Sequence, residues 1–151
     1  MKKSLKHPQE GDVFILQPQK NLFYFGKVIQ INLKSIDSFI NGMTLIYIYD
    51  SSSNEKVVPK HFDEKDLLIA PIVVNNQPWI KGYFETVDNI PISKREINLE
   101  FGFWDFLTQE YVDIRGKKME NRPKYCGTYG LGSYGAVGKE VQKAIKLEQP
   151  E

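Results

Sequence analysis

The segment from Gly130 to Val137 reads Gly-Leu-Gly-Ser-Tyr-Gly-Ala-Val, which has the G-x-G-x-x-G-x-V spacing of a kinase phosphate-binding loop. In kinases this loop lies near the start of a much larger fold, and catalytic-loop and metal-binding signatures follow it. Here the motif lies close to the end of the sequence, without those signatures, and without the second half of a dinucleotide-binding βαβ unit. We therefore predict a flexible loop that leads into a last helix. An anion held by backbone N–H groups at the helix start is the alternative.

Side chains that act as nucleophiles or metal ligands are few. The chain has two histidines, His7 and His61, and one cysteine, Cys126, so no zinc site with several ligands can be written. A nucleophilic Cys126 needs a nearby base, for which His61 is the one candidate; we expect Cys126 instead to pack as a small apolar residue. Carboxylates are abundant, but acid–base catalysis needs two that converge in a cleft. The sequence therefore predicts no enzyme, no metal and no cofactor.

A basic segment near two tyrosines offers a different chemistry. Its side chains are Arg115, Lys117, Lys118, Arg122, Lys124, Tyr125 and Tyr129. Basic and aromatic residues together can bind single-stranded nucleic acid through phosphate contacts and base stacking. The sequence pI of about 7.7 is far below that of a typical nucleic-acid-binding domain. We therefore favour a protein partner over nucleic acid.

Charge is distributed unevenly along the chain. Residues 1–34 carry a net charge of +4, residues 35–113 carry −7, and residues 114–151 carry +4. An acidic surface that faces a basic partner is one interpretation, since complementary fields steer association; a solvated charged rim is the plainer one, and we weight it more. The predicted contact residues are the acidic and aromatic side chains Asp63, Glu64, Asp66, Trp104, Asp105 and Glu110.

Length and composition place limits on the class of protein. A chain of 151 residues, 41% hydrophobic and 26% charged, is long enough to bury one self-sufficient core. We expect one domain over residues 1–151. With a single cysteine no internal disulfide forms, and no signal-peptide or membrane-spanning segment follows the basic N-terminus. The prediction is a cytoplasmic protein that is neither exported nor inserted into a membrane.

Apolar periodicity predicts a mostly β (α+β) fold, with a curled antiparallel sheet or partial barrel of about seven strands and a short C-terminal helix. Residues 43–50 read as a central strand because both faces are apolar. Pro71 moves the strand at 68–74 toward a sheet edge. Alternation from Ile97 to Phe103 predicts one buried face, with Trp104 on the opposite side. The other expected strands are 11–16, 22–31, 79–87 and 111–114, with a loop at 51–54, a helical turn at 61–67 and a helix around 137–145. The first two strands flank a Gln-Lys-Asn turn and read as a hairpin, and Gly26 inside the second suggests a bulge or a close backbone approach.

Four segments form a recognisable pattern: Gly11-Asp12-Val13-Phe14, Tyr24-Phe25-Gly26-Lys27-Val28-Ile29, Ile46-Tyr47-Ile48-Tyr49-Asp50, and the stretch Ile69–Glu85 with Trp79 and Gly82-Tyr83-Phe84. They resemble the immunity protein 26 family, whose pattern is a "GDVF" strand, a "Y-x-G-R-V" strand and a strand that ends in Asp. Lys27 stands where the family commonly has Arg. The resemblance covers about two thirds of the chain.

The resemblance implies a bacterial, cytoplasmic, non-enzymatic protein, encoded beside a polymorphic toxin, that neutralises this cognate toxin by direct binding. An acidic surface would suit a basic nuclease toxin. No functional residue is carried over from the family, because the matching positions look like strand and turn positions. The alternative is a small-barrel nucleic-acid-binding or ribonuclease-type module, which would need a cluster of Arg or His residues at a groove.

Overall fold

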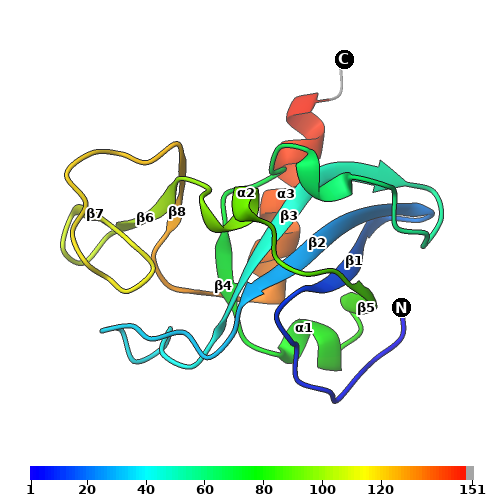
Figure 1. Ribbon diagram of the computed structural model, residues 1–151, viewed down its shortest axis with the longest axis horizontal. Coiled ribbons are helices and arrows are strands. Elements are labelled where there is room, and N and C mark those ends of the chain that lie inside the picture. The colour runs from blue at the N-terminus through cyan, green and yellow to red at the C-terminus, as the bar shows by residue number, and fades with distance from the viewer. Residues whose placement is uncertain (149–151) are drawn as a thin grey trace.

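The computed structural model describes residues 1–148, which form one six-stranded and one three-stranded sheet with helices on both sides of the larger sheet (Figure 1). In chain order the elements are β1 (Asp12–Gln19), β2 (Leu22–Gln30), β3 (Thr44–Ser53), the 3-10 helix η1 (Phe62–Glu64), β4 (Ile72–Val74), α1 (Gln77–Ile80), β5 (Phe84–Asn89), α2 (Lys94–Ile97), β6 (Phe101–Asp105), β7 (Glu110–Val112), β8 (Tyr125–Thr128), β9 (Leu131–Gly132) and α3 (Tyr134–Glu148).

The main sheet has the strand order β5-β1-β2-β3-β4-β9, and the small sheet has the order β7-β6-β8. Neither sheet closes into a barrel, and the predicted mostly β fold with a C-terminal helix is confirmed. Within residues 1–148 the pairings β4–β9 and β6–β8 are parallel and the others antiparallel. The sequence does not reveal β8 and β9 as strands, because they are only four and two residues long.

The first hairpin forms as predicted, with Asn21 in the left-handed region (φ 61°) at its turn. Gly26 lies in β2 opposite Phe14 of β1, and a Cβ atom at Gly26 would be 2.4 Å from the Phe14 ring. The Phe14 ring therefore fills the space where a side chain would be. The same Cβ would lie 2.8 Å from the Tyr47 carbonyl oxygen, and the β2–β3 register shifts between Tyr24 and Gly26, so this glycine marks both a close backbone approach and an irregularity of the strand.

Strand β3 is central, as predicted, and pairs with both β2 and β4. It is longer than expected, because Ser52 and Ser53 pair with β2 rather than forming a loop. The predicted edge position of this strand is wrong, because β9 pairs in parallel with the outer side of β4. Pro71 lies just before β4, so the proline does not interrupt the ladder.

Two predicted strands begin as helices instead. Trp79 lies in α1, where Pro78 occupies the first turn, and only 2% of the Trp79 side chain is exposed. Ile97 ends α2 and is 66% exposed, so it does not join a buried strand face. A capping box made by Ser93 and Glu96 starts α2, and this reciprocal pair of hydrogen bonds outweighs the period-2 pattern that follows it.

Each face of the main sheet is covered by a different layer. Helix α3 lies behind the sheet in Figure 1 and buries Val137, Val141 and Ile145 against it, as the helical spacing predicted. The opposite face packs against the small sheet, where Phe103 and Val112 join its core. Helix α2 lies in front of this face (Figure 1).

The front layer contains a buried ion pair. The side chain of Lys27 has no exposed surface, and its Nζ lies 2.8 Å from Glu96 Oε1 and 3.5 Å from Asp63 Oδ2. Lys27 Nζ also donates to the carbonyl oxygen of Pro91 at 3.0 Å. The Tyr49 hydroxyl donates to Glu96 Oε2 at 2.5 Å. Charge-assisted hydrogen bonds, the strong class of such bonds, thereby join strands β2 and β3 to α2, and the ion pair with Asp63 joins β2 to η1.

Breaking this pair is expected to destabilise the fold strongly. Lys27→Met keeps most of the side-chain volume but leaves the Glu96 carboxylate buried without its partner, which should lower the free energy of unfolding by about 3 to 5 kcal/mol. Urea unfolding followed by circular dichroism measures the change.

Lys56→Met is the matched control, because Lys56 pairs with Glu85 at 3.4 Å while 46% of its side chain is exposed. Loss of such a surface pair should cost under about 1 kcal/mol. The double variant Lys27→Met with Glu96→Gln should recover part of the loss. Equal destabilisation by Lys27→Met and Lys56→Met would contradict a structural role for the buried pair.

Alkaline pH is expected to unfold the protein through the same cluster. Burial, together with the Glu96 carboxylate, raises the pKa of both Tyr47 and Tyr49 well above the ordinary tyrosine value. Above pH about 10 the unfolded chain releases these phenol protons while the folded chain retains them, so the folded state binds more protons and its stability falls as pH rises. Absorbance at 295 nm should show two tyrosines that ionise only as the far-ultraviolet circular dichroism is lost. Ionisation of all eight tyrosines in the folded state would refute this.

Candidate partner-binding surface

The six predicted contact residues fall into two groups on different elements. Trp104 and Asp105 lie in β6 and Glu110 lies in β7, so these three share one hairpin of the small sheet. Asp63 and Glu64 lie in η1, and Asp66 follows that helix. The structure therefore brings each group together but divides the six residues between two sites.

The turn between β6 and β7 is fixed by local hydrogen bonds. The Leu107 amide donates to Asp105 Oδ1 at 3.0 Å, and the Gln109 amide donates to the Asp105 carbonyl oxygen at 2.8 Å. Gln109 has a positive φ of 58°, and its side-chain amide donates to the Phe106 carbonyl oxygen at 2.9 Å. The turn thus presents its side chains from an ordered backbone.

Apolar side chains project from this turn. Phe106 is 65% exposed and Leu107 is 92% exposed. Trp104 is half-buried, and its ring makes edge contacts with Tyr111 at 4.9 Å and with Phe106 at 6.5 Å between centroids. Large apolar side chains that remain in water beside a half-buried tryptophan are typical of a binding surface.

Acidic side chains flank the exposed turn. Asp105 pairs directly with Glu110 across the β6–β7 ladder. Glu110 has a cationic neighbour, since its Oε1 lies 3.7 Å from Lys118 Nζ. The tip therefore combines apolar anchors with carboxylates at their edge, and we call the surface formed by Trp104, Asp105, Phe106, Leu107 and Glu110 the hairpin tip.

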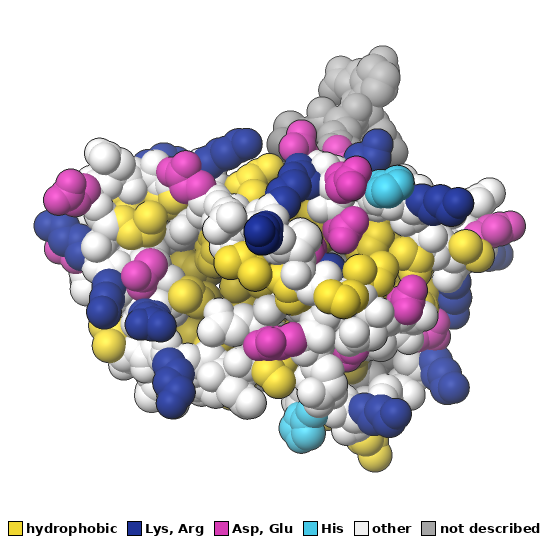
Figure 2. Space-filling model, in the orientation of Figure 1, with side chains coloured by type: hydrophobic (Ala, Val, Ile, Leu, Met, Phe, Trp, Pro, Cys, Tyr) yellow, Lys and Arg dark blue, Asp and Glu magenta, His cyan; other side chains and the backbone are white. Residues whose placement is uncertain are grey.

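A groove of about 610 Å³ continues from the hairpin tip toward the main sheet. Trp104 and Phe106 line one side, and Leu131 and Ala136 contribute from β9 and the start of α3. Figure 2 shows apolar side chains gathered between the small and main sheets, with acidic and basic side chains interspersed around them. The face drawn there therefore offers an apolar centre with charges of both signs at its border.

The glycine-rich segment contributes structure to this groove. Leu131 and Gly132 form β9 and pair with β4, so the segment is part of the main sheet and not simply the loop that we predicted. A Cβ atom on Gly132 would lie 2.6 Å from Ile72 Cδ1, so a larger residue here would require the Ile72 side chain to move. Ser133 caps α3, since its Oγ accepts the Ala136 amide at 3.1 Å. Gly132 thus serves in strand pairing and Ser133 in capping the helix.

The second acidic group is tied to the framework. Asp63 is half-buried beside Lys27, and its carbonyl oxygen accepts a hydrogen bond from Arg95 Nη1 at 2.9 Å. Glu64 Oε1 lies 3.3 Å from His61 Nδ1, and both side chains are largely exposed. Asp63 thus has a structural role, while Glu64 and Asp66 remain exposed on the surface.

Residues that could act as nucleophiles or metal ligands do not assemble into a site in the described residues. Cys126 is half-buried in β8, and its Sγ lies 3.7 Å from the Gly127 carbonyl oxygen, whereas His61 pairs with Glu64. Across residues 1–148 no group of three or more His, Cys, Asp or Glu side chains could hold a metal ion. No helix in the same part of the chain has the length and apolar character needed to cross a membrane.

A family model described as Immunity protein 26 matches residues 9–111. The chain belongs to the immunity protein 26 family. The resemblance of the strand motifs to this family is thereby confirmed. Neither the curated proteins nor the solved structures include a significant match to this chain.

The immunity protein 26 match spans the framework and the hairpin tip but not the C-terminal helix. It includes Lys27 and Glu96, and it ends at Tyr111 in β7. Family membership therefore covers the buried ion pair and the turn that carries Phe106 and Leu107. Sequence reasoning did not nominate these two residues, although apolar residues that continue past Asp105 at the end of a strand cannot all face the core.

The exposed residues of the tip should contribute little to folding. Phe106→Ser and Leu107→Ser are each expected to change the free energy of unfolding by no more than about 0.5 kcal/mol, because both side chains already face water. Phe103→Ala in the preceding strand β6 is the contrast, since Phe103 is 1% exposed and its removal should cost about 3 to 5 kcal/mol. Thermal unfolding measures all three. A large loss for Phe106→Ser would show that the tip belongs to the core.

Proposed function

We propose that residues 1–151 act as one immunity domain that binds and neutralises a cognate bacterial toxin in the cytoplasm, without catalysis. The observation that carries this proposal is the immunity protein 26 match over residues 9–111. The toxin would be the product of the neighbouring gene in a polymorphic toxin system. An exposed apolar and acidic surface gives such a protein a means of binding that needs no reactive side chain.

The hairpin tip is the proposed contact surface. Binding energy at protein interfaces is concentrated in a few large side chains near the centre, and tryptophan is prominent among them. Trp104 lies near the end of β6, and Phe106 and Leu107 follow it in an ordered turn, so little backbone conformational entropy would be lost when they are covered. The adjacent groove of about 610 Å³ would receive a side chain or loop of the toxin.

The carboxylates supply the proposed selectivity. Asp105 and Glu110 lie opposite each other beside the apolar residues, so a basic surface of the toxin would be attracted to this edge. A nuclease is a suitable toxin class, because its substrate-binding cleft is basic. Glu64 and Asp66 would act as outer charges, and Asp63 less so because it already faces Lys27.

The test is to co-produce the chain with the toxin encoded beside its gene and to measure growth and complex formation. The wild-type chain should relieve growth arrest and bind the purified toxin. Phe106→Ser with Leu107→Ser should weaken binding by about 2 kcal/mol or more, which is roughly a 30-fold rise in Kd. Ile36→Ser with Phe39→Ser is the matched control, because these side chains are 81% and 73% exposed and lie outside the tip.

Charge reversal tests the acidic edge separately. Asp105→Lys with Glu110→Lys should slow association with a basic toxin, and the difference from wild type should shrink at high salt. If binding is unchanged in both tip variants, the contact surface is elsewhere. If the wild-type chain leaves the toxin active, or binds RNA in its place, the proposed function is wrong.

A further inference from the structure

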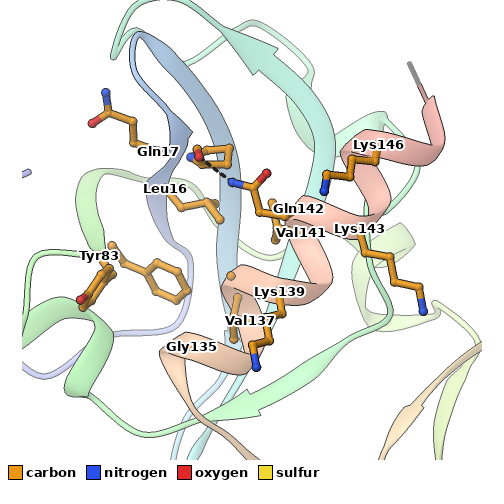
Figure 3. A pocket seen from close by; sticks show the side chains of 13 residues that line it. Leu16, Gln17, Tyr83, Gly135, Val137, Lys139, Val141, Gln142, Lys143 and Lys146 are labelled. Carbon is orange, nitrogen blue, oxygen red and sulfur yellow. Dashed lines mark hydrogen bonds between the residues drawn. The ribbon is translucent and has the colours of Figure 1, made fainter. Parts of the chain in front are cut away.

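A second groove lies on another part of the molecule, between helix α3 and the adjoining ends of β1 and β5. It has a volume of about 600 Å³, and none of its lining residues belongs to the hairpin tip. Figure 3 shows Tyr83 on one side of this groove and the α3 residues Val137 and Lys139 on the other. The groove therefore separates the C-terminal helix from an edge of the main sheet.

The floor of the groove is apolar and rigid. Leu16 of β1 pairs with Phe84 of β5, and Val137 and Val141 approach from α3. These four side chains have exposed fractions of 6% or less, so they pack well below the rim. Gln142 fixes the helix at one end of the groove, since its Nε2 donates to the Pro18 carbonyl oxygen at 2.6 Å (Figure 3).

The rim on the helix side is basic. Lys139, Lys143 and Lys146 are exposed and line the groove at intervals of four and three residues, so successive lysines follow the helix on one side. From Lys139 to Lys146 the helix rises about 10.5 Å, which is two turns. Within the described residues, no lining residue of this groove is acidic. The rim would thus attract carboxylates placed along a segment of about two helical turns.

The groove also permits close approach of another backbone. Gly135 and Gly138 line it from α3, and a Cβ atom added to Gly138 would have no atom within 4 Å. There is therefore open space beside the helix where a second helix could pack. Apolar helices that bind in such grooves place side chains at i, i+3, i+4 and i+7 along one face.

We propose that this groove binds an acidic amphipathic helix of a protein partner. The apolar side of that helix would cover Tyr83, which is 51% exposed, and the alkyl stems of the lysines above the buried floor. Its acidic residues, spaced four and three apart, would lie beside Lys139, Lys143 and Lys146. Charge complementarity selects this occupant, because a neutral or basic helix would gain nothing from three lysines. The groove shares no residue with the hairpin tip and has the opposite charge, so this interaction is proposed as separate from toxin neutralisation.

The location of the groove relative to the family match supports a separate role. The groove residues on the sheet, such as Leu16 and Phe84, lie within the matched residues 9–111, whereas α3 lies outside them. The lysines of α3 therefore give a positive charge to a groove whose other side is an edge of the main sheet.

The test selects helices from a phage-displayed library with a fixed apolar seam and with Glu, Lys, Gln and Ala randomised at the flanking positions. Selection uses the full chain, with counter-selection on Gly138→Leu, which fills the groove while favouring the helix more than glycine does. The enriched helices should be acidic, with Glu at the four-and-three spacing. Their affinity, measured by fluorescence anisotropy of the synthetic peptides, should fall at least tenfold for Gly138→Leu.

Charge variants provide the matched control. Lys139→Glu, Lys143→Glu and Lys146→Glu together should also weaken binding at least tenfold. Lys34→Glu, Lys60→Glu and Lys117→Glu together make the same change in net charge at exposed positions away from the groove, and should change binding less than twofold. Circular dichroism confirms that each variant is folded.

Four results would overturn the proposal. They are enrichment of neutral or basic helices, no enrichment, equal loss of binding in the two triple variants, and a wild-type dimer in analytical ultracentrifugation that Gly138→Leu converts to a monomer. The last result would assign the groove to a second copy of the chain. None of them bears on toxin neutralisation, which the hairpin-tip variants test separately.

Discussion

The ammonium group of Lys27, which is fully enclosed, determines how the layers of this protein fit together. A buried cation is tolerated only when nearby groups replace the water that it has lost. Here the replacements come from Glu96, from the carbonyl oxygen of Pro91 and from Asp63. Glu96 lies in α2 and Asp63 lies in η1, so the buried charge of Lys27 holds both elements in place against β2.

This constraint extends to the surface that we assign to binding. Glu96 both caps α2 and accepts the Tyr49 hydroxyl, and its carbonyl oxygen accepts the Tyr47 hydroxyl at 3.0 Å. Strand β6 begins at Phe101, four residues after α2 ends at Ile97. The ion pair therefore also sets the point from which the small sheet leaves the main one, and hence the direction of the hairpin tip.

Local signals in the sequence predicted much of the framework. The hairpin of β1 and β2, the central strand β3 and helix α3 follow from apolar periodicity and from turn residues near Asn21. The prediction was wrong at α2, where the capping residues Ser93 and Glu96 start a helix and the alternation from Ile97 was interpreted as a strand. The pairing of Lys27 with Glu96 was out of reach, because the two residues are 69 positions apart and a lone lysine in a strand gives no sign of its partner.

The residues of the proposed contact surface were predictable only in part, for a related reason. Charge and residue type identified Trp104, Asp105 and Glu110, which the cross-strand pairing then brings together. The same signals grouped Asp63 with Glu64 and Asp66, although Asp63 faces the buried lysine. Net charge along a sequence does not distinguish a carboxylate that is paired inside from one that faces water, and apolar residues at a turn are missed when every apolar residue is assumed to face the core.

The exposed position of Phe106 and Leu107 also has an evolutionary consequence. Most substitutions in a protein lower its stability, and selection removes those that bring it below the threshold for folding. Side chains that bury little surface in the free protein are largely exempt from that filter. Under the proposed toxin binding, a lineage could alter these two positions repeatedly and explore new specificities, while the interior that supports them stays the same.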